Sequence, residues 1–182
     1  TGISNTLIGG EAGDALTDAD DNVAVGRLAL SGDTLGSGNT AIGRGALKVQ
    51  NFTTATFSYN TGVGYGSGGS ITTGTENTLI GGIAGDALTD ADGNTSVGYS
   101  SLTSDTLGSK STAIGRSALA TQNFTTATDS HNTAVGYQAG VAVTTGTENT
   151  LIGGLAGDAL TTGGANTAVG YRSLSASNTA AG

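Results

Sequence analysis

One five-residue phrase, Asn-Thr-x-[Ile/Val]-Gly, recurs with small variations along the whole chain and limits what the chain can fold into. Successive copies start 17 residues apart, except after Asn39 and Ser111, where the spacing is 21, and before a final start at Asn178, where it is 12. A short phrase repeated at nearly constant spacing predicts a solenoid, in which each copy forms one rung of a stack. Complete copies start at Asn5, Asn22, Asn39, Asn60, Asn77, Asn94, Ser111, Asn132, Asn149 and Asn166.

The rungs are grouped into a longer repeat of 72 residues. The stretch TTGTENTLIGG starts at Thr72 and again at Thr144, and QNFTTAT starts at Gln50 and again at Gln122. We therefore divide one repetitive segment, residues 1–182, into units at 5–76 and 77–148 and a partial unit at 149–182. Because the chain starts and stops within the pattern, we interpret it as a fragment of a longer protein.

The composition excludes several classes of protein. There are 33 Gly and no Cys, Pro, Met or Trp, and charged residues make up only 11 %, so a single thick core is not expected. The net charge is −8 and the six basic residues are dispersed, which argues against nucleic-acid binding through phosphates. No run of about 20 apolar residues is present, so we expect no membrane insertion.

Each phrase is predicted to be a short β-strand, because Thr, Ile and Val favour extended backbone. Since side chains alternate between the two faces of a strand, we expect the Ile/Val position, with Thr beside it, to fill a thin core. A second short strand and a polar turn are expected after the Gly. The predicted core residues are Ile8, Val25, Ile42, Val63, Ile80, Val97, Ile114, Val135, Ile152 and Val169.

The first position of the phrase is predicted to form a ladder between rungs. Stacked Asn side chains can donate and accept hydrogen bonds along the stack, which needs no ligand. The ladder residues are Asn5, Asn22, Asn39, Asn60, Asn77, Asn94, Asn132, Asn149 and Asn166. A rung this thin buries few apolar side chains, and the small third residue and the Gly leave room for another chain. We therefore expect self-association, most simply as a symmetric homo-oligomer.

The copies NTAIGRGAL at Asn39, STAIGRSAL at Ser111 and NTAVGYQAG at Asn132 resemble the head repeats of the YadA-like trimeric autotransporter adhesins and related bacteriophage tail-fibre repeats. The resemblance covers essentially the whole chain. It implies an all-β, left-handed parallel β-roll of about ten 17–21-residue rungs, forming a homotrimer about a common axis. The rungs are longer than is usual in that family, and no stalk or anchor is visible, which leaves open whether the parent is a phage fibre, an adhesin or another filament.

Two kinds of candidate site stand out from the repeat. The two 21-residue rungs carry Phe52 and Phe124, which either project as binding loops or pack back over the end of the rung. Alternating carboxylates at Asp18, Asp20, Asp90 and Asp92 look like the opening of a calcium loop but lack the distal Glu, so solvated turns are the other interpretation.

Catalytic signals are weak. His131 is the single His, and no Cys is present to join it as a ligand or catalytic partner. No paired carboxylates lie on a predicted strand, so we predict that the chain is not an enzyme. Gly64, Gly66 and Gly69 match a dinucleotide-binding spacing, but no helix pattern follows, and the copy at Gly136 lacks the later glycines.

The sequence therefore predicts a rigid structural rod of a phage tail fibre or bacterial surface filament, at the virion or cell surface, that positions or contributes to surface attachment. Its expected partners are its own copies and a cell-surface receptor or glycan, with no cofactor except possible calcium. The alternative is a monomeric ligand-binding solenoid, calcium-stabilised or ice-binding; an ice-binding face would need the Thr row to face outward, whereas we expect it to face inward.

Overall fold

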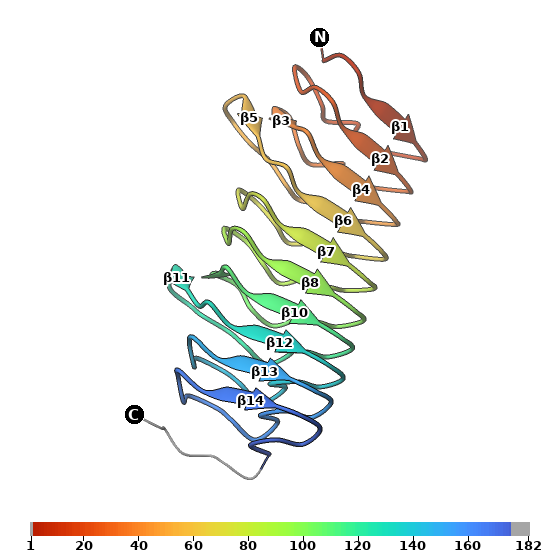
Figure 1. Cartoon of the computed structure of the whole chain (residues 1–182). Coiled ribbons are helices and arrows are strands. Elements are labelled where there is room, and N and C mark those ends of the chain that lie inside the picture. The colour runs from red at the N-terminus through yellow and green to blue at the C-terminus, as the bar shows by residue number, and fades with distance from the viewer. Residues whose placement is uncertain (1, 176–182) are drawn as a thin grey trace.

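The computed structural model describes residues 2–175 and shows a β-solenoid of about ten turns (Figure 1). Every described phrase forms one three-residue strand, and the phrase start at Asn178 lies outside the described residues. No helix occurs within residues 2–175. These strands are β1 (Thr6–Ile8), β2 (Val23–Val25), β4 (Thr40–Ile42), β6 (Thr61–Val63), β7 (Thr78–Ile80), β8 (Thr95–Val97), β10 (Thr112–Ile114), β12 (Thr133–Val135), β13 (Thr150–Ile152) and β14 (Thr167–Val169).

The ten strands form one parallel sheet in which each strand pairs with the next copy of the phrase. The register is set by the repeat, so that Thr78 lies beside Thr95 and Ile80 beside Val97. Parallel strands lie about 4.8 Å apart, and ten of them therefore span about 43 Å. Every phrase position becomes a straight row of side chains along the rod.

Two small parallel pairs flank the long rungs at the opposite edge from the main sheet (Figure 1). The first joins β3 (Gly36–Ser37) to β5 (Thr56–Phe57), and the second joins β9 (Gly108–Ser109) to β11 (Thr128–Asp129). In both pairs, the second strand belongs to a 21-residue rung. The four extra residues are thus partly absorbed by additional strand pairing.

The prediction of which strand face fills the core was wrong. The third residue of the phrase points inward, and Ala24, Ala41 and Leu79 have no exposed surface. The Ile/Val position and the Thr position lie on the opposite, outer face, where Ile8 is 59 % exposed. The predicted core residues that instead lie outward, exposed or half-exposed, are Ile8, Val25, Ile42, Val63, Ile80, Val97, Ile114, Val135, Ile152 and Val169.

The physical reason is the narrow interior of each rung. The strand residue faces the residue six positions later across the core, and together they fill a small space. Where the strand supplies Leu79, the facing residue is Gly85, and a Cβ there would lie 2.8 Å from Leu79 Cδ2. Where the strand supplies Ala41, the facing residue is Leu47, and both are fully buried. Two large side chains would not fit, so the Ile/Val row cannot share this space.

The conserved Gly of the phrase permits a close approach between rungs of the same chain. Gly81 has φ of 135°, a region that only Gly adopts readily. A Cβ on Gly81 would lie 2.4 Å from the carbonyl oxygen of Gly98 in the next rung. The expectation that the Gly and the small third residue admit a second chain is therefore wrong, because the next rung and the rung's own core occupy those spaces.

The predicted second strand is instead a series of turns. Two of its residues in each rung have positive φ, such as Leu28 at 62° and Leu30 at 51°. The rungs still bond to each other here, since Leu30 N–H donates to Ala46 O at 3.0 Å. The left-handed residues bend the chain back toward the next phrase within a few positions, which an extended strand would not do.

Candidate functional site

The asparagines of the phrase form a buried hydrogen-bonded ladder, as the sequence predicts. Asn94 N–H donates to Asn77 Oδ1 at 3.0 Å, and Asn77 N–H donates to Asn60 Oδ1 at 2.9 Å. The Asn77 side-chain amide also donates to Ala91 O at 2.7 Å, which ties the start of the strand to the end of the same rung, just before the next phrase. The same backbone-to-amide bond joins Asn5, Asn22, Asn39, Asn60, Asn77 and Asn94, and then Asn132, Asn149 and Asn166. The ladder is structural.

The predicted loop residues Phe52 and Phe124 are not projecting knobs. Each is only 6 % exposed, which agrees with the interpretation that they pack over the end of the rung. The exposed aromatic residues of the first long rung are Phe57 and Tyr59, whose rings stack with centroids 5.6 Å apart. The alternation Phe57-Ser58-Tyr59, with Ser58 buried between them, is the signal that sequence reasoning missed.

A buried carboxylate organises each long rung, and the sequence did not indicate it. Asp33 is fully buried and accepts hydrogen bonds from Gly36 N–H at 3.0 Å, Phe52 N–H at 3.2 Å and Gln50 Nε2 at 2.6 Å. Asp105 makes the same three contacts in the second unit. Because three donors satisfy the carboxylate, it holds the longer loop in place.

The second long rung has Asp129 and His131 in place of the exposed aromatic pair, and Asp129 forms an ion pair with Lys110 of the preceding rung. Lys110 Nζ lies 2.5 Å from Asp129 Oδ2, and both side chains are about half exposed. The hydrogen bond from Lys110 holds the pKa of the Asp129 carboxyl below its usual value. His131 occupies the position of Tyr59. The two long rungs therefore share a buried framework and differ at their outer tips.

The calcium candidates lie on the surface in two separate places. Asp20 Oδ1 accepts Ile3 N–H at 2.7 Å, and Asp92 Oδ1 accepts Thr75 N–H at 2.6 Å, so these oxygens bond to the preceding rung. Asp90 accepts a hydrogen bond from the Thr73 hydroxyl. The pair Asp18 and Asp20 and the pair Asp90 and Asp92 lie four rungs apart, about 19 Å along the rod, and are not brought together. Residues 2–175 contain no group of three His, Cys, Asp or Glu side chains placed to hold a metal.

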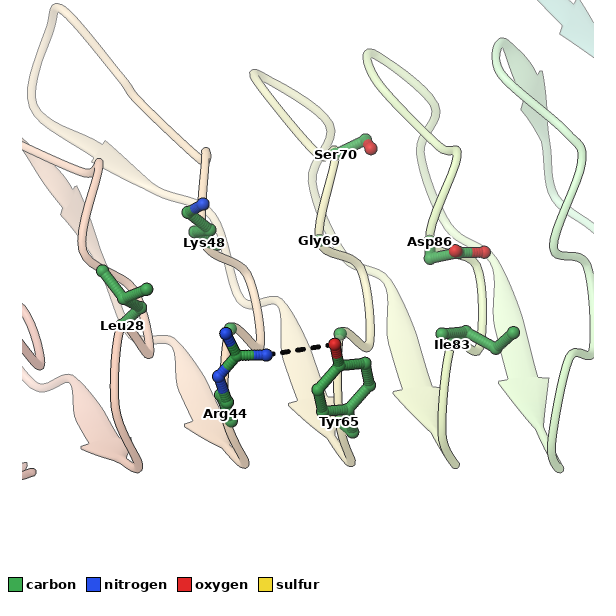
Figure 2. A pocket seen from close by; sticks show the side chains of 10 residues that line it. Leu28, Arg44, Lys48, Tyr65, Gly69, Ser70, Ile83 and Asp86 are labelled. Carbon is green, nitrogen blue, oxygen red and sulfur yellow. Dashed lines mark hydrogen bonds between the residues drawn. The ribbon is translucent and has the colours of Figure 1, made fainter.

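A groove of about 420 Å³ runs from the first unit onto the first rung of the second unit, along the segment that follows the Gly of each phrase (Figure 2). Arg44 and Lys48 come from one rung, Tyr65 and Ser70 from the next, and Asp86 from the rung after that. Arg44 Nη1 donates to the Tyr65 hydroxyl at 3.0 Å, and the guanidinium carbon lies 5.5 Å from the ring centroid. Gly66 and Gly69, which match a dinucleotide-binding spacing without the helix that should follow it, both line this groove.

The outer face of the main sheet carries a continuous surface of Ile, Val and Thr side chains. Its Ile/Val row runs beside a row of Thr residues from β1 to β14. The Thr row is Thr6, Thr40, Thr61, Thr78, Thr95, Thr112, Thr133, Thr150 and Thr167, with Val23 in the remaining place. We call these two rows the Thr/Ile face. No helix within the described residues is long and apolar enough to cross a membrane.

Comparisons with known proteins identify no family for this chain. No protein-family model, no curated protein and no solved structure matches this chain.

Proposed function

We propose that this chain is a rigid, non-enzymatic segment of an extracellular fibre at a virion or cell surface, such as a phage tail fibre or a bacterial adhesin. In this proposal, three copies of a left-handed β-roll associate about a common axis through the Thr/Ile face. The segment positions, or contributes to, a surface attachment. The observation that carries the proposal is the outward Ile/Val row that continues through all ten strands of the sheet.

The apolar row supports association because it is long, regular and exposed. Ile42, Ile80, Ile114 and Ile152 are 37–40 % exposed at the same place in their rungs. Scattered apolar residues on a surface need no explanation, but a continuous stripe along a rod marks an interaction surface. A second copy in parallel would present the same row at the same spacing. Burying the stripe would add apolar contacts to rungs whose own cores are thin.

Molar mass in solution tests the proposal directly. The unmodified protein is expected to have three times the 17.5 kDa mass of one chain when measured by light scattering. Ile80→Asp is expected to reduce that mass, because it places a charge in the stripe that the trimer would bury. Val49→Asp is the matched control, because Val49 is similarly exposed, at 42 %, but lies off the Thr/Ile face. A single-chain mass for the unmodified protein would refute the trimer.

The outward Thr row favours a second candidate, a monomeric ice-binding solenoid. Thr lies on the outer face of the sheet, contrary to the inward direction expected from the sequence. Thr and Ile/Val side chains form a grid of about 4.8 Å along the rod and about 6.6 Å across it, a regular surface that could order water. A single-chain mass together with thermal hysteresis would support this candidate over the trimer. A melting temperature raised by calcium would support a calcium-stabilised solenoid, with Asp18, Asp20, Asp90 and Asp92 as the candidate ligands.

A further inference from the structure

The groove of the first unit collects positive charge on a chain that is otherwise acidic. The net charge of the chain is −8, yet Arg44 and Lys48 lie together at one end of the groove (Figure 2). Within residues 2–175, the ion pairs involve other cations, Arg27 and Lys110, and neither Arg44 nor Lys48 forms one. The bond to Tyr65 uses one of the five N–H donors of Arg44. Both groove cations are exposed and able to meet an anion.

The other end of the groove has different chemistry. Asp86 lies two rungs away from Lys48, about 10 Å along the rod, and supplies a carboxylate acceptor. Ser70 supplies a hydroxyl, and the Tyr65 ring, 59 % exposed, lies between the two ends. A ligand that fits these groups has an anionic end, hydroxyls at its other end and a C–H face for the aromatic ring. A simple inorganic anion would use only the cationic end.

Comparison with the second unit shows that the groove depends on a few substitutions. Arg44, Tyr65 and Asp86 have identical counterparts 72 residues later, in Arg116 and Tyr137 of the second unit and Asp158 of the partial third unit. The floor of the groove differs, because small residues are replaced and one cation is lost. These differences are Gly45 against Ser117, Lys48 against Ala120, Gly66 against Gln138, Gly69 against Val141 and Ser70 against Ala142, and the lining also differs at Leu28 against Ser100 and Ile83 against Leu155. Glycine floors and the second cation are therefore special to the first unit, and the second unit is an internal control.

We propose that this groove binds a carboxylated pyranose, either free or as the acidic residue of a glycan. Arg44 and Lys48 bind the carboxylate through charge-assisted hydrogen bonds. Asp86 and Ser70 bind ring hydroxyls, and Tyr65 packs against the C–H face of the sugar. The volume of about 420 Å³ is within the range of small-molecule sites. This inference goes beyond the fibre proposal by naming a ligand class and a site.

The second unit supplies a substitution that fills the groove without straining the backbone. Gly66 has φ of 63°, and its counterpart Gln138 has φ of 53°, so this turn already accepts Gln in the same conformation. A Cβ on Gly66 would lie 3.6 Å from Ile83 Cγ2, an ordinary contact. Gly66→Gln therefore places a side chain in the groove while keeping the fold. Lys48→Ala copies the second unit at an exposed position.

The experiment uses the intact chain and methyl β-glucuronide as the probe, followed by saturation-transfer NMR of the ligand. Methyl β-glucoside is the neutral control, and sodium sulfate is the simple-anion competitor. We expect the glucuronide to bind, the glucoside to bind at least tenfold more weakly, and sulfate to compete poorly. Lys48→Ala is expected to weaken glucuronide binding roughly tenfold, the size of one charge-assisted hydrogen bond. Gly66→Gln is expected to abolish it.

The reverse change provides a gain of binding. Ala120→Lys, combined with Ser117→Gly, Gln138→Gly, Val141→Gly and Ala142→Ser, should open a second groove, so that the stoichiometry rises from one to two sugars per chain. Light scattering and thermal unfolding of each variant should match those of the unmodified protein, which separates a lost site from a lost fold. If Gly66→Gln fails to fold, Lys48→Ala and the groove opened in the second unit test the proposal instead. Equal binding of glucoside, equal competition by sulfate or unchanged binding in Gly66→Gln would each overturn the proposal. The fibre proposal is tested separately, by the molar mass of the unmodified protein in solution.

Discussion

Removing one rung of the asparagine ladder should loosen the backbone at one specific amide. Asn77 has no exposed surface, and its Oδ1 is the acceptor for Asn94 N–H at 3.0 Å. Its side-chain amide donates to Ala91 O at 2.7 Å. Asn77→Ala removes both bonds and brings no replacement. It also removes the longer side-chain bonds to Asn60 Oδ1 and Thr75 O and from Asn94 Nδ2, but Asn60 Oδ1 and Thr75 O each keep another donor. Two buried backbone groups, one donor and one acceptor, lose these partners.

The size of the effect follows from the cost of a buried group without a partner. That cost is about 1–3 kcal/mol for each group, so two groups give at most about 2–6 kcal/mol. A stack of repeats need not unfold in a single step, so a global unfolding free energy is a poor measure. Amide hydrogen exchange reads the site itself. A local loss of about 1–3 kcal/mol at Asn94 corresponds to exchange about 5- to 150-fold faster.

The design has an internal control and a matched variant. The amide of Thr95 donates to Ser111 O at 2.9 Å, a bond that Asn77→Ala leaves in place. Thr78→Ala changes the neighbouring side chain on the outer face and should leave exchange at Asn94 unchanged. If Asn94 and Thr95 accelerate equally in Asn77→Ala, the loss is not local. If neither accelerates, the ladder does not stabilise the rungs and the reasoning is refuted.

Two further outcomes follow from the structure. Gly81→Ala should destabilise the rod by about 1–3 kcal/mol from backbone strain alone, because its φ is 135°. The clash adds to this, because the new Cβ would lie 2.4 Å from Gly98 O. A thermal melt measures the loss, and Gly10→Ala, whose Cβ would have no atom within 4 Å, is the control. Lys110→Ala should return the pKa of Asp129 toward its usual value, as followed by NMR titration, because the Lys110 hydrogen bond lowers it. Since the pKa of Asp129 is lower in the folded state, any stabilisation from this pair is present above the unfolded pKa and is lost as pH falls through the folded pKa. An Asp129 titration that is unchanged in Lys110→Ala would contradict this assignment.

Much of the fold is readable from the repeat. The spacing of the phrase predicts a stack of rungs, and the Asn position predicts a ladder, because identical residues at a constant period must meet in a parallel stack. The strands begin and end within the phrase, as in β7 (Thr78–Ile80). These features depend only on the order of residues along one rung, which is local information.

The candidate sites were harder to predict because they depend on neighbours from other rungs. Phe52 is buried because the Asp33 carboxylate of the preceding rung holds its loop, and no local pattern marks Asp33. The groove needs Lys48, Gly66 and Asp86 from three successive rungs. Their proximity follows from stacking, but which side of the rung they share depends on turns with positive φ that the sequence does not mark.

The alternation of the phrase established by itself that Thr and Ile/Val share one face of each strand and that the third residue takes the other. Only the tertiary structure decided which face is the inside. The alternation of side chains along a strand does not say which face is buried. Leu79 is enclosed because Gly85 leaves space for it, whereas Ile80 has no such space and lies on the outer face. Hydrophobicity favours burial of both, but the volume of a 17-residue rung admits one, and the other is left to form the exposed Thr/Ile face.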